Sequence, residues 1–288
     1  MHRSGTSFLA RCLNVSGVYL GKNLIHSDGS AIDNPKGFWE DKDFTLLSEK
    51  FMAENNGSWE QIPSNLKCSE TLNQQFKSKV DKLVSESYIS AGVKDPRLLV
   101  ILDSILDVFP KNKMYVGIFR HPLKVAESLK IRNNFNYEKS LAMWQDYNSK
   151  LLEYIIDNNG FLFDFDWPKE KLLDEISLLV KKVGLLETNL NLVYSKDLFR
   201  SDKSYSSSYK IPAEIEETYK KLKERSMQNN TVKPIPITFS MDESRKIMTR
   251  MLEIINEYTE VKKGDSSSEN TIKNEKRVRK ILKKYFKI

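Results

Sequence analysis

A short apolar run at residues 114–119, Met-Tyr-Val-Gly-Ile-Phe, ends abruptly at Arg120 and His121, and Pro122 follows. An apolar segment of this length without polar alternation is typical of a buried parallel strand, and proline favours the first turn of a helix. The run therefore predicts a strand that leads directly into a helix at residues 122–131, with Arg120 at the strand's carboxyl end. Such a unit needs helices on both faces of its sheet, which excludes most other fold classes.

The rest of the first 200 residues alternates in the same way. Residues 161–165 predict a second buried strand. Helical spacing of apolar residues predicts helices at 7–15, 41–55, 70–85, 98–109, 137–157 and 172–183. The alternation predicts an α/β fold, a doubly wound parallel sheet with flanking helices, which binds its ligands at the carboxyl ends of the strands.

The pattern weakens after about residue 188. We expect residues 1–210 to form the α/β domain and residues 211–263 to form a helical extension, with helices at 212–225 and 241–258. A Ser-rich segment at 201–210 predicts a loop. Residues 264–288 are expected to be a linker and a basic amphipathic tail.

Residues 1–7, Met-His-Arg-Ser-Gly-Thr-Ser, have the character of an anion-binding loop. Gly5 permits a tight turn, and Thr6 and Ser7 open the helix that follows, so backbone N–H groups and the positive end of the helix dipole meet at one point. The Gly-Lys-Ser/Thr ending of nucleoside triphosphate loops is absent, and the cation, Arg3, precedes the glycine instead. The loop predicts a phosphate or sulfate site, and a solvated polar segment is the alternative.

A second anion site is predicted where Arg120 ends its strand. Ser128 lies two helical turns further on, so its hydroxyl and the guanidinium can converge on one phosphate. In the alternative reading, Arg120 only caps the strand and Ser128 is an exposed hydroxyl on the helix.

The two sites together resemble those of sulfotransferases that use 3′-phosphoadenylyl sulfate (PAPS). Residues 120–128 are similar to their Arg-x-Pro-x-x-Val-x-x-Ser pattern, and residues 3–7 to their 5′-phosphosulfate loop. Asn-Pro-Lys-Gly-Phe-Trp-Glu at 34–40 and Lys-Asp-Pro-Arg at 94–97 resemble segments of the bacterial-type, glycan-modifying branch. The resemblance covers about residues 1–200 and implies a P-loop-like fold. It implies that PAPS is bound by Arg3, Ser4, Gly5, Thr6, Ser7, Arg120 and Ser128.

The resemblance also implies the chemistry, which is transfer of a sulfuryl group from PAPS to a hydroxyl or amine of a saccharide or other small molecule, with no metal required. Arg3 would stabilise the leaving phosphate. Glu40, at the end of the 34–40 segment, is the leading candidate for the base, although a solvated glutamate starting the next helix would look the same. Asp95 could be the base instead, or could orient Arg97.

One departure concerns the first strand of the sheet. Proteins of this family carry an apolar strand and a glycine immediately before the loop, whereas nothing precedes Met1 here. We therefore expect the sheet of this chain to lack its first strand.

Composition is compatible with this reading. The 288 residues carry a net charge of +7, which suits anionic ligands in general. Cys12 and Cys68 are the only cysteines and have no zinc-site spacing, so a reducing, cytoplasmic location is expected. No apolar run reaches the roughly 18 residues of a membrane span. No nucleic-acid partner is expected.

The C-terminal segment could contact a membrane peripherally. Val278, Ile281, Leu282, Tyr285 and Ile288 lie at helical spacing among many lysines and arginines. A basic amphipathic helix of this kind binds anionic lipid surfaces, but its apolar stripe could equally pack on the protein core.

Two other functions remain open from the sequence. A P-loop kinase or other nucleotide phosphotransferase would use a similar loop, normally with Gly-Lys-Ser/Thr. A truncated, non-catalytic remnant that binds a glycan or a membrane would also show these residues.

Overall fold

The structure, a computed structural model, describes residues 1–25, 37–87, 89–194, 209–234 and 236–237. The chain divides into two units, Met1–Pro236 and Ile237–Ile288, and the fold below is that of the first unit. The predicted helix at 241–258, the tail at 264–288 and most of the predicted loop at 201–210 lie outside the described residues.

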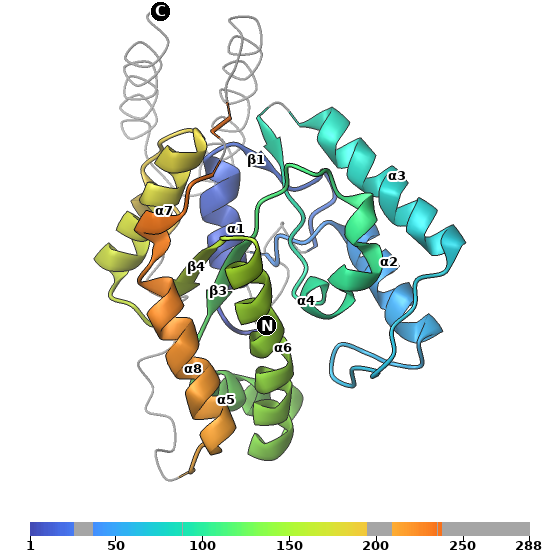
Figure 1. Ribbon diagram of the computed structural model, residues 1–288, viewed down its shortest axis with the longest axis vertical. Coiled ribbons are helices and arrows are strands. Elements are labelled where there is room, and N and C mark those ends of the chain that lie inside the picture. The colour runs from blue at the N-terminus through green and yellow to red at the C-terminus, as the bar shows by residue number, and fades with distance from the viewer. Residues whose placement is uncertain (26–36, 88, 195–208, 235, 238–288) are drawn as a thin grey trace, which may run out of the picture. The chain divides into compact units, whose positions relative to one another are not determined.

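The described part of the chain is mixed α/β, mostly helical, with two small parallel sheets (Figure 1). Strand β3 (Val116–Phe119) pairs with β4 (Phe161–Asp164), Val116 opposite Phe161 and Phe119 opposite Asp164. Both strands and their parallel pairing follow the sequence prediction. A second pair joins β1 (Val18–Tyr19) to β2 (Ser90–Ala91). In the described residues the two pairs are separate sheets, so the predicted single sheet is present only as these two parts.

The helices predicted within the described residues are present, with changes at their ends. The α-helices are α1 (Thr6–Val15), α2 (Lys42–Glu54), α3 (Glu70–Glu86), α4 (Leu98–Ile101), α5 (Pro122–Asn133), α6 (Tyr137–Asp157), α7 (Lys169–Val183) and α8 (Ala213–Ser226). Short 3₁₀ helices are η1 (Leu102–Val108), η2 (Leu190–Leu192) and η5 (Asn229–Thr231). The prediction of one continuous helix at 98–109 is therefore wrong in detail. The segment contains the short α-helix α4 followed by the 3₁₀ helix η1, inside which Ile105 departs from helical geometry with φ −132°.

Side-chain caps explain where several helices begin. Asp41 accepts a hydrogen bond from the backbone N–H of Phe44 at the start of α2, and Asn136 accepts one from Lys139 at the start of α6. Helix α7 ends at Gly184, whose φ of 78° is the left-handed conformation that suits glycine. Local sequence chemistry thus fixes these ends.

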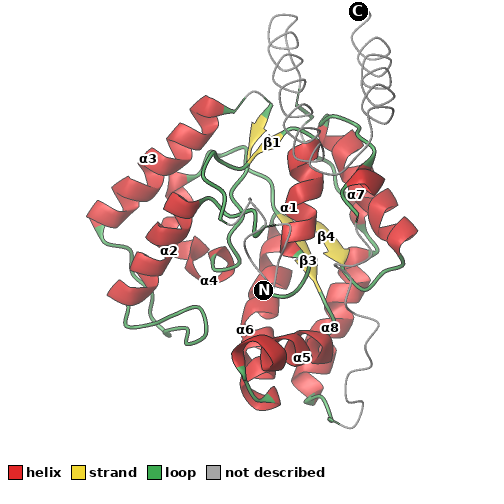
Figure 2. Ribbon diagram, turned by 180° about the vertical axis from the view of Figure 1, so that it is seen from behind, coloured by secondary structure: helices red, strands yellow, loops and turns green. Residues whose placement is uncertain are grey.

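The β3–β4 sheet lies between helices (Figures 1 and 2). Helices α6 and α8 contact each other and the sheet, and α1 and α7 do the same on its other side. The main hydrophobic core includes the buried side chains of Trp144 and Tyr147 from α6 and of Phe119 from β3. Helix α8, which the sequence analysis assigns to an extension, packs here as part of the first unit.

Asn229 completes the hydrogen bonding of β4. Its side-chain oxygen accepts a bond from the Leu162 N–H at 3.0 Å, and its amide nitrogen donates to the Leu162 carbonyl at 2.9 Å. The Asn229 side chain is buried and also donates to Glu175. One side chain thus replaces a neighbouring strand for Leu162, whose buried backbone groups would otherwise be unpaired.

We therefore predict that Asn229→Ala lowers the free energy of unfolding by about 2–4 kcal/mol, because two buried backbone groups lose their partners. Urea unfolding followed by circular dichroism measures this. The neighbouring exposed Asn230 is the control, and Asn230→Ala should change stability by less than about 0.5 kcal/mol. Equal effects of the two substitutions would contradict the role given to Asn229.

Candidate functional site

The N-terminal loop turns sharply into α1. Arg3 and Gly5 have φ of 63° and 84°, and Gly5, as the residue before the helix, has no side chain that caps the first turn. A Cβ atom at Gly5 would lie 2.2 Å from the ring of Phe165, so this position requires glycine for space as well as for conformation. Positive φ values beside a helix start favour a concave backbone that can receive an anion.

The loop lies against the end of β3 and the start of α5. The Nε of Arg3 donates to the Ser128 hydroxyl at 2.8 Å, and Arg120 donates from Nη1 to the Arg3 carbonyl at 3.4 Å. The two predicted anion sites lie more than 100 residues apart in the sequence, and the structure places Arg3 of one beside Ser128 and Arg120 of the other.

Arg120 is the cation at the centre of this arrangement. Its guanidinium lies over the Phe165 ring, 5.5 Å from the centroid, and its buried Nε has no hydrogen-bond acceptor. The nearest carboxylate oxygen, on Asp166, is 3.7 Å from that Nε. Burial lowers the pKa of Arg120, partly offset by Asp166. A buried guanidinium with an unused N–H can donate a hydrogen bond to an oxygen of an anion.

Asp166 organises the cations around Arg120. One of its oxygens accepts a hydrogen bond from the backbone N–H of His121 at 2.8 Å, and the other pairs with Lys124 at 2.8 Å. The His121 ring accepts from the N–H of Leu123, which caps α5. The sequence analysis did not single out Asp166. Its position directly after the predicted strand at 161–165 could have identified it, because ligand-binding side chains gather at strand ends.

Ser4 and Ser7 use their side chains within the protein. Ser4 is fully buried, and its hydroxyl lies 3.5 Å from the His2 carbonyl. The Ser7 hydroxyl donates to the carbonyl of Phe38 at 3.0 Å. Thr6 is half-buried in the first turn of α1. These residues can therefore offer an anion their backbone N–H groups more readily than their hydroxyls.

The second group of predicted residues forms a buried charge cluster beside the loop. Lys94 donates to the Phe38 carbonyl at 2.9 Å and also pairs with Glu40. Arg97 reaches the other Glu40 oxygen at 3.3 Å. Burial raises the pKa of Glu40, while Lys94 and Arg97 act in the opposite direction. Of the 34–40 segment, residues 34–36 lie outside the described part of the chain.

Asp95 holds Arg97 in place. One Asp95 oxygen accepts hydrogen bonds from the backbone N–H and the Nε of Arg97, at 2.9 and 2.8 Å. Arg97 also reaches Glu49 at 2.9 Å. Of the two roles that the sequence leaves open for Asp95, this geometry matches the orienting one.

Asp164, the last residue of β4, is a buried carboxyl group within electrostatic reach of Lys124 and Lys223. It accepts a hydrogen bond from the backbone N–H of Asp166 at 2.9 Å. Burial raises its pKa to about 6. Because this folded-state pKa is above the unfolded-state value, ionised Asp164 destabilises the fold above pH 6, and the cost disappears as the pH falls toward 4.

Asp164→Asn should therefore increase stability relative to the parent by about 3 kcal/mol more at pH 8 than at pH 4, since each pKa unit corresponds to about 1.4 kcal/mol. The amide oxygen can keep the bond to Asp166. Urea titrations at the two pH values measure the difference, with Asp174→Asn, at an exposed position of α7, as the control. A pH-independent effect of Asp164→Asn would contradict the assignment.

The described residues were also searched for metal sites and membrane-spanning helices. Among the residues that the structure describes, no three His, Cys, Asp or Glu side chains group to hold a metal ion. None of the described helices is long and apolar enough to cross a membrane.

Comparison with known proteins gives no match of the chain to a family model, a curated protein or a solved structure.

Proposed function

We propose that the chain transfers a sulfuryl group from PAPS to an acceptor hydroxyl or amine. The observation that carries the proposal is the convergence of Arg3, Ser128 and Arg120 beside the Gly5 turn, through hydrogen bonds of 2.8 and 3.4 Å. A donor nucleotide with two separate phosphate groups needs two adjacent anion sites. A loop at a helix start and a strand-end arginine supply them.

The architecture supports the same ligand position. Arg120 and Asp166 follow the carboxyl ends of β3 and β4, and open parallel sheets bind ligands at this edge. We propose that the two observed strand pairs belong to one doubly wound sheet of the P-loop-like kind. Arg120 and Ser128 would hold the 3′-phosphate, and the 3–7 loop the 5′-phosphosulfate. The buried Nε of Arg120, which has no hydrogen-bond acceptor and lies 3.7 Å from Asp166, fits this use.

In the proposed reaction, the acceptor oxygen forms a bond to sulfur while the bond between sulfur and the bridging phosphate oxygen breaks. The leaving group is adenosine 3′,5′-bisphosphate (PAP), whose new negative charge Arg3 and the loop N–H groups would stabilise. The acceptor proton would go to Glu40. Burial among Lys94 and Arg97 fixes the position of that carboxylate, and the raised pKa makes it a better proton acceptor than an exposed glutamate.

Arg120→Ala should weaken PAP binding, measured by calorimetry without magnesium, by about 2–4 kcal/mol, because charge-assisted hydrogen bonds to a phosphate are lost. Lys77→Ala, which removes an exposed cation of α3, is the control for net charge and should bind like the parent. Circular dichroism verifies that both variants fold. Equal affinity of Arg120→Ala and the parent for PAP would contradict the assignment of Arg120 to a phosphate of the nucleotide.

Glu40→Gln should lower kcat by roughly 100-fold or more and leave PAP affinity nearly unchanged, because a base acts on the acceptor and not on nucleotide binding. PAP release from PAPS, with an acceptor found by screening saccharides, measures kcat. Glu49→Gln is the matched control, since Glu49 also pairs with Arg97 but is exposed. If both variants lose activity equally, the loss comes from a displaced Arg97 and Glu40 is not the base.

A further inference from the structure

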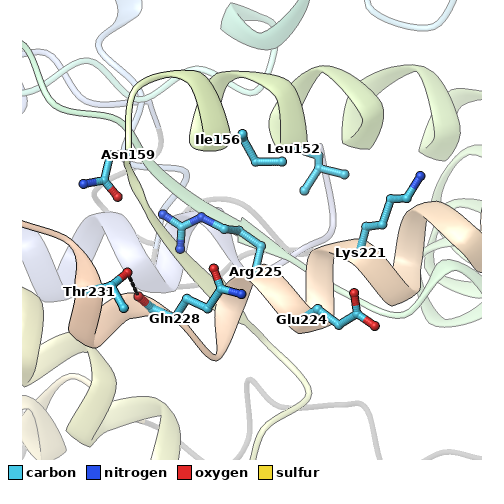
Figure 3. A pocket seen from close by; sticks show the side chains of 8 residues that line it. All are labelled: Leu152, Ile156, Asn159, Lys221, Glu224, Arg225, Gln228 and Thr231. Atoms are coloured by element: carbon cyan, nitrogen blue, oxygen red, sulfur yellow. Dashed lines mark hydrogen bonds between the residues drawn. The ribbon is translucent and has the colours of Figure 1, made fainter.

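A groove is lined by residues of α6, among them Leu152 and Ile156, and of α8, among them Lys221 and Arg225 (Figure 3). It encloses about 440 Å³. Its position is at the other end of β4, since Arg225 in the groove bonds to Gly160, the residue before the strand, whereas the candidate site follows Asp164. Any ligand of the groove is therefore separate from the proposed nucleotide.

Arg225 is the buried cation of the groove. The residue is only 9% exposed. Nη2 donates to the Gly160 carbonyl at 2.6 Å, while the buried Nη1 has no acceptor. No carboxylate of the described residues lies within ion-pair distance of Arg225. The adjacent Glu224 extends toward the Lys221 side of the groove, away from the guanidinium (Figure 3). An uncompensated buried cation is costly, so an anionic partner would be stabilised here.

The remaining lining is partly apolar. Leu152 and Ile156 of α6 face the aliphatic part of Arg225 across the groove, and Ile156 is 55% exposed (Figure 3). Asn159 and Gln228 add side-chain amides near the guanidinium. A ligand near Arg225 would thus meet the guanidinium, two amides and an aliphatic wall, while Lys221 and Glu224 line another part of the groove.

We propose that the groove binds an organic monocarboxylate, with its carboxylate on Arg225 and its hydrocarbon part along Leu152 and Ile156. A planar guanidinium matches a carboxylate, and amide groups can donate further bonds. A hydrocarbon part gains by covering the exposed side chain of Ile156, at about 25 cal/mol per Å² of apolar surface buried. Burial lowers the pKa of Arg225, yet an arginine stays charged at neutral pH.

The test is calorimetric titration of the full chain with octanoate, octanol and inorganic phosphate. Octanoate should bind at least tenfold more tightly than either of the other two, since octanol lacks the charge and phosphate lacks the hydrocarbon part. Octanol or phosphate binding as tightly as octanoate would overturn the proposal, as would no binding of octanoate.

Substitutions test whether octanoate binds in this groove. Ile156→Asp places a carboxylate beside Arg225 on an exposed surface, where folding should be unaffected, and should weaken octanoate binding at least tenfold. Arg225→Met should do the same. Lys220→Met, at an exposed position of α8 outside the groove, should bind octanoate like the parent. Unchanged octanoate affinity in Ile156→Asp would refute the assignment even if Arg225→Met failed to fold.

Discussion

The hydrogen bond from Arg3 to Ser128 joins the two halves of the candidate site. It connects the loop that opens α1 to the helix that follows β3, and Arg120 strengthens the junction through the Arg3 carbonyl. Phe165 supports both sides, because its ring packs on Gly5 and lies under the Arg120 guanidinium. Without this junction, the backbone turn and the strand-end cation would not lie side by side, as the proposed common ligand requires.

Buried charges around the junction are arranged before any ligand binds. Asp166 positions the backbone of His121 and the ammonium group of Lys124. Glu40 is held by two cations and is itself buried. Burying ions is costly unless they are paired and hydrogen-bonded, so such a cluster gains little stability. The cluster keeps polar groups in fixed positions, as the proposed catalysis by electrostatic stabilisation requires.

Local chemistry made much of the fold predictable. Helix α6 follows from its periodicity and the Asn136 cap, and β3 from an uninterrupted apolar run. Strands β1 and β2 have two residues each, too few for a periodic signal, so they were missed. Motif spacing led to the prediction that Arg120 and Ser128 share an anion, and in the structure each of them contacts Arg3. The contact between Arg3 and Ser128 depends on packing across 125 positions, which no local pattern encodes.

In the proposed function, two adjacent anion sites hold one nucleotide with two phosphate groups. Calorimetric titration of the full chain with PAP, adenosine 5′-monophosphate and adenosine 3′-monophosphate tests this arrangement. PAP should bind at least about 30-fold more tightly than either monophosphate, because each phosphate adds charge-assisted hydrogen bonds that contribute about 2 kcal/mol or more. If a monophosphate binds as tightly as PAP, one of the two sites does not exist and the proposed function is wrong.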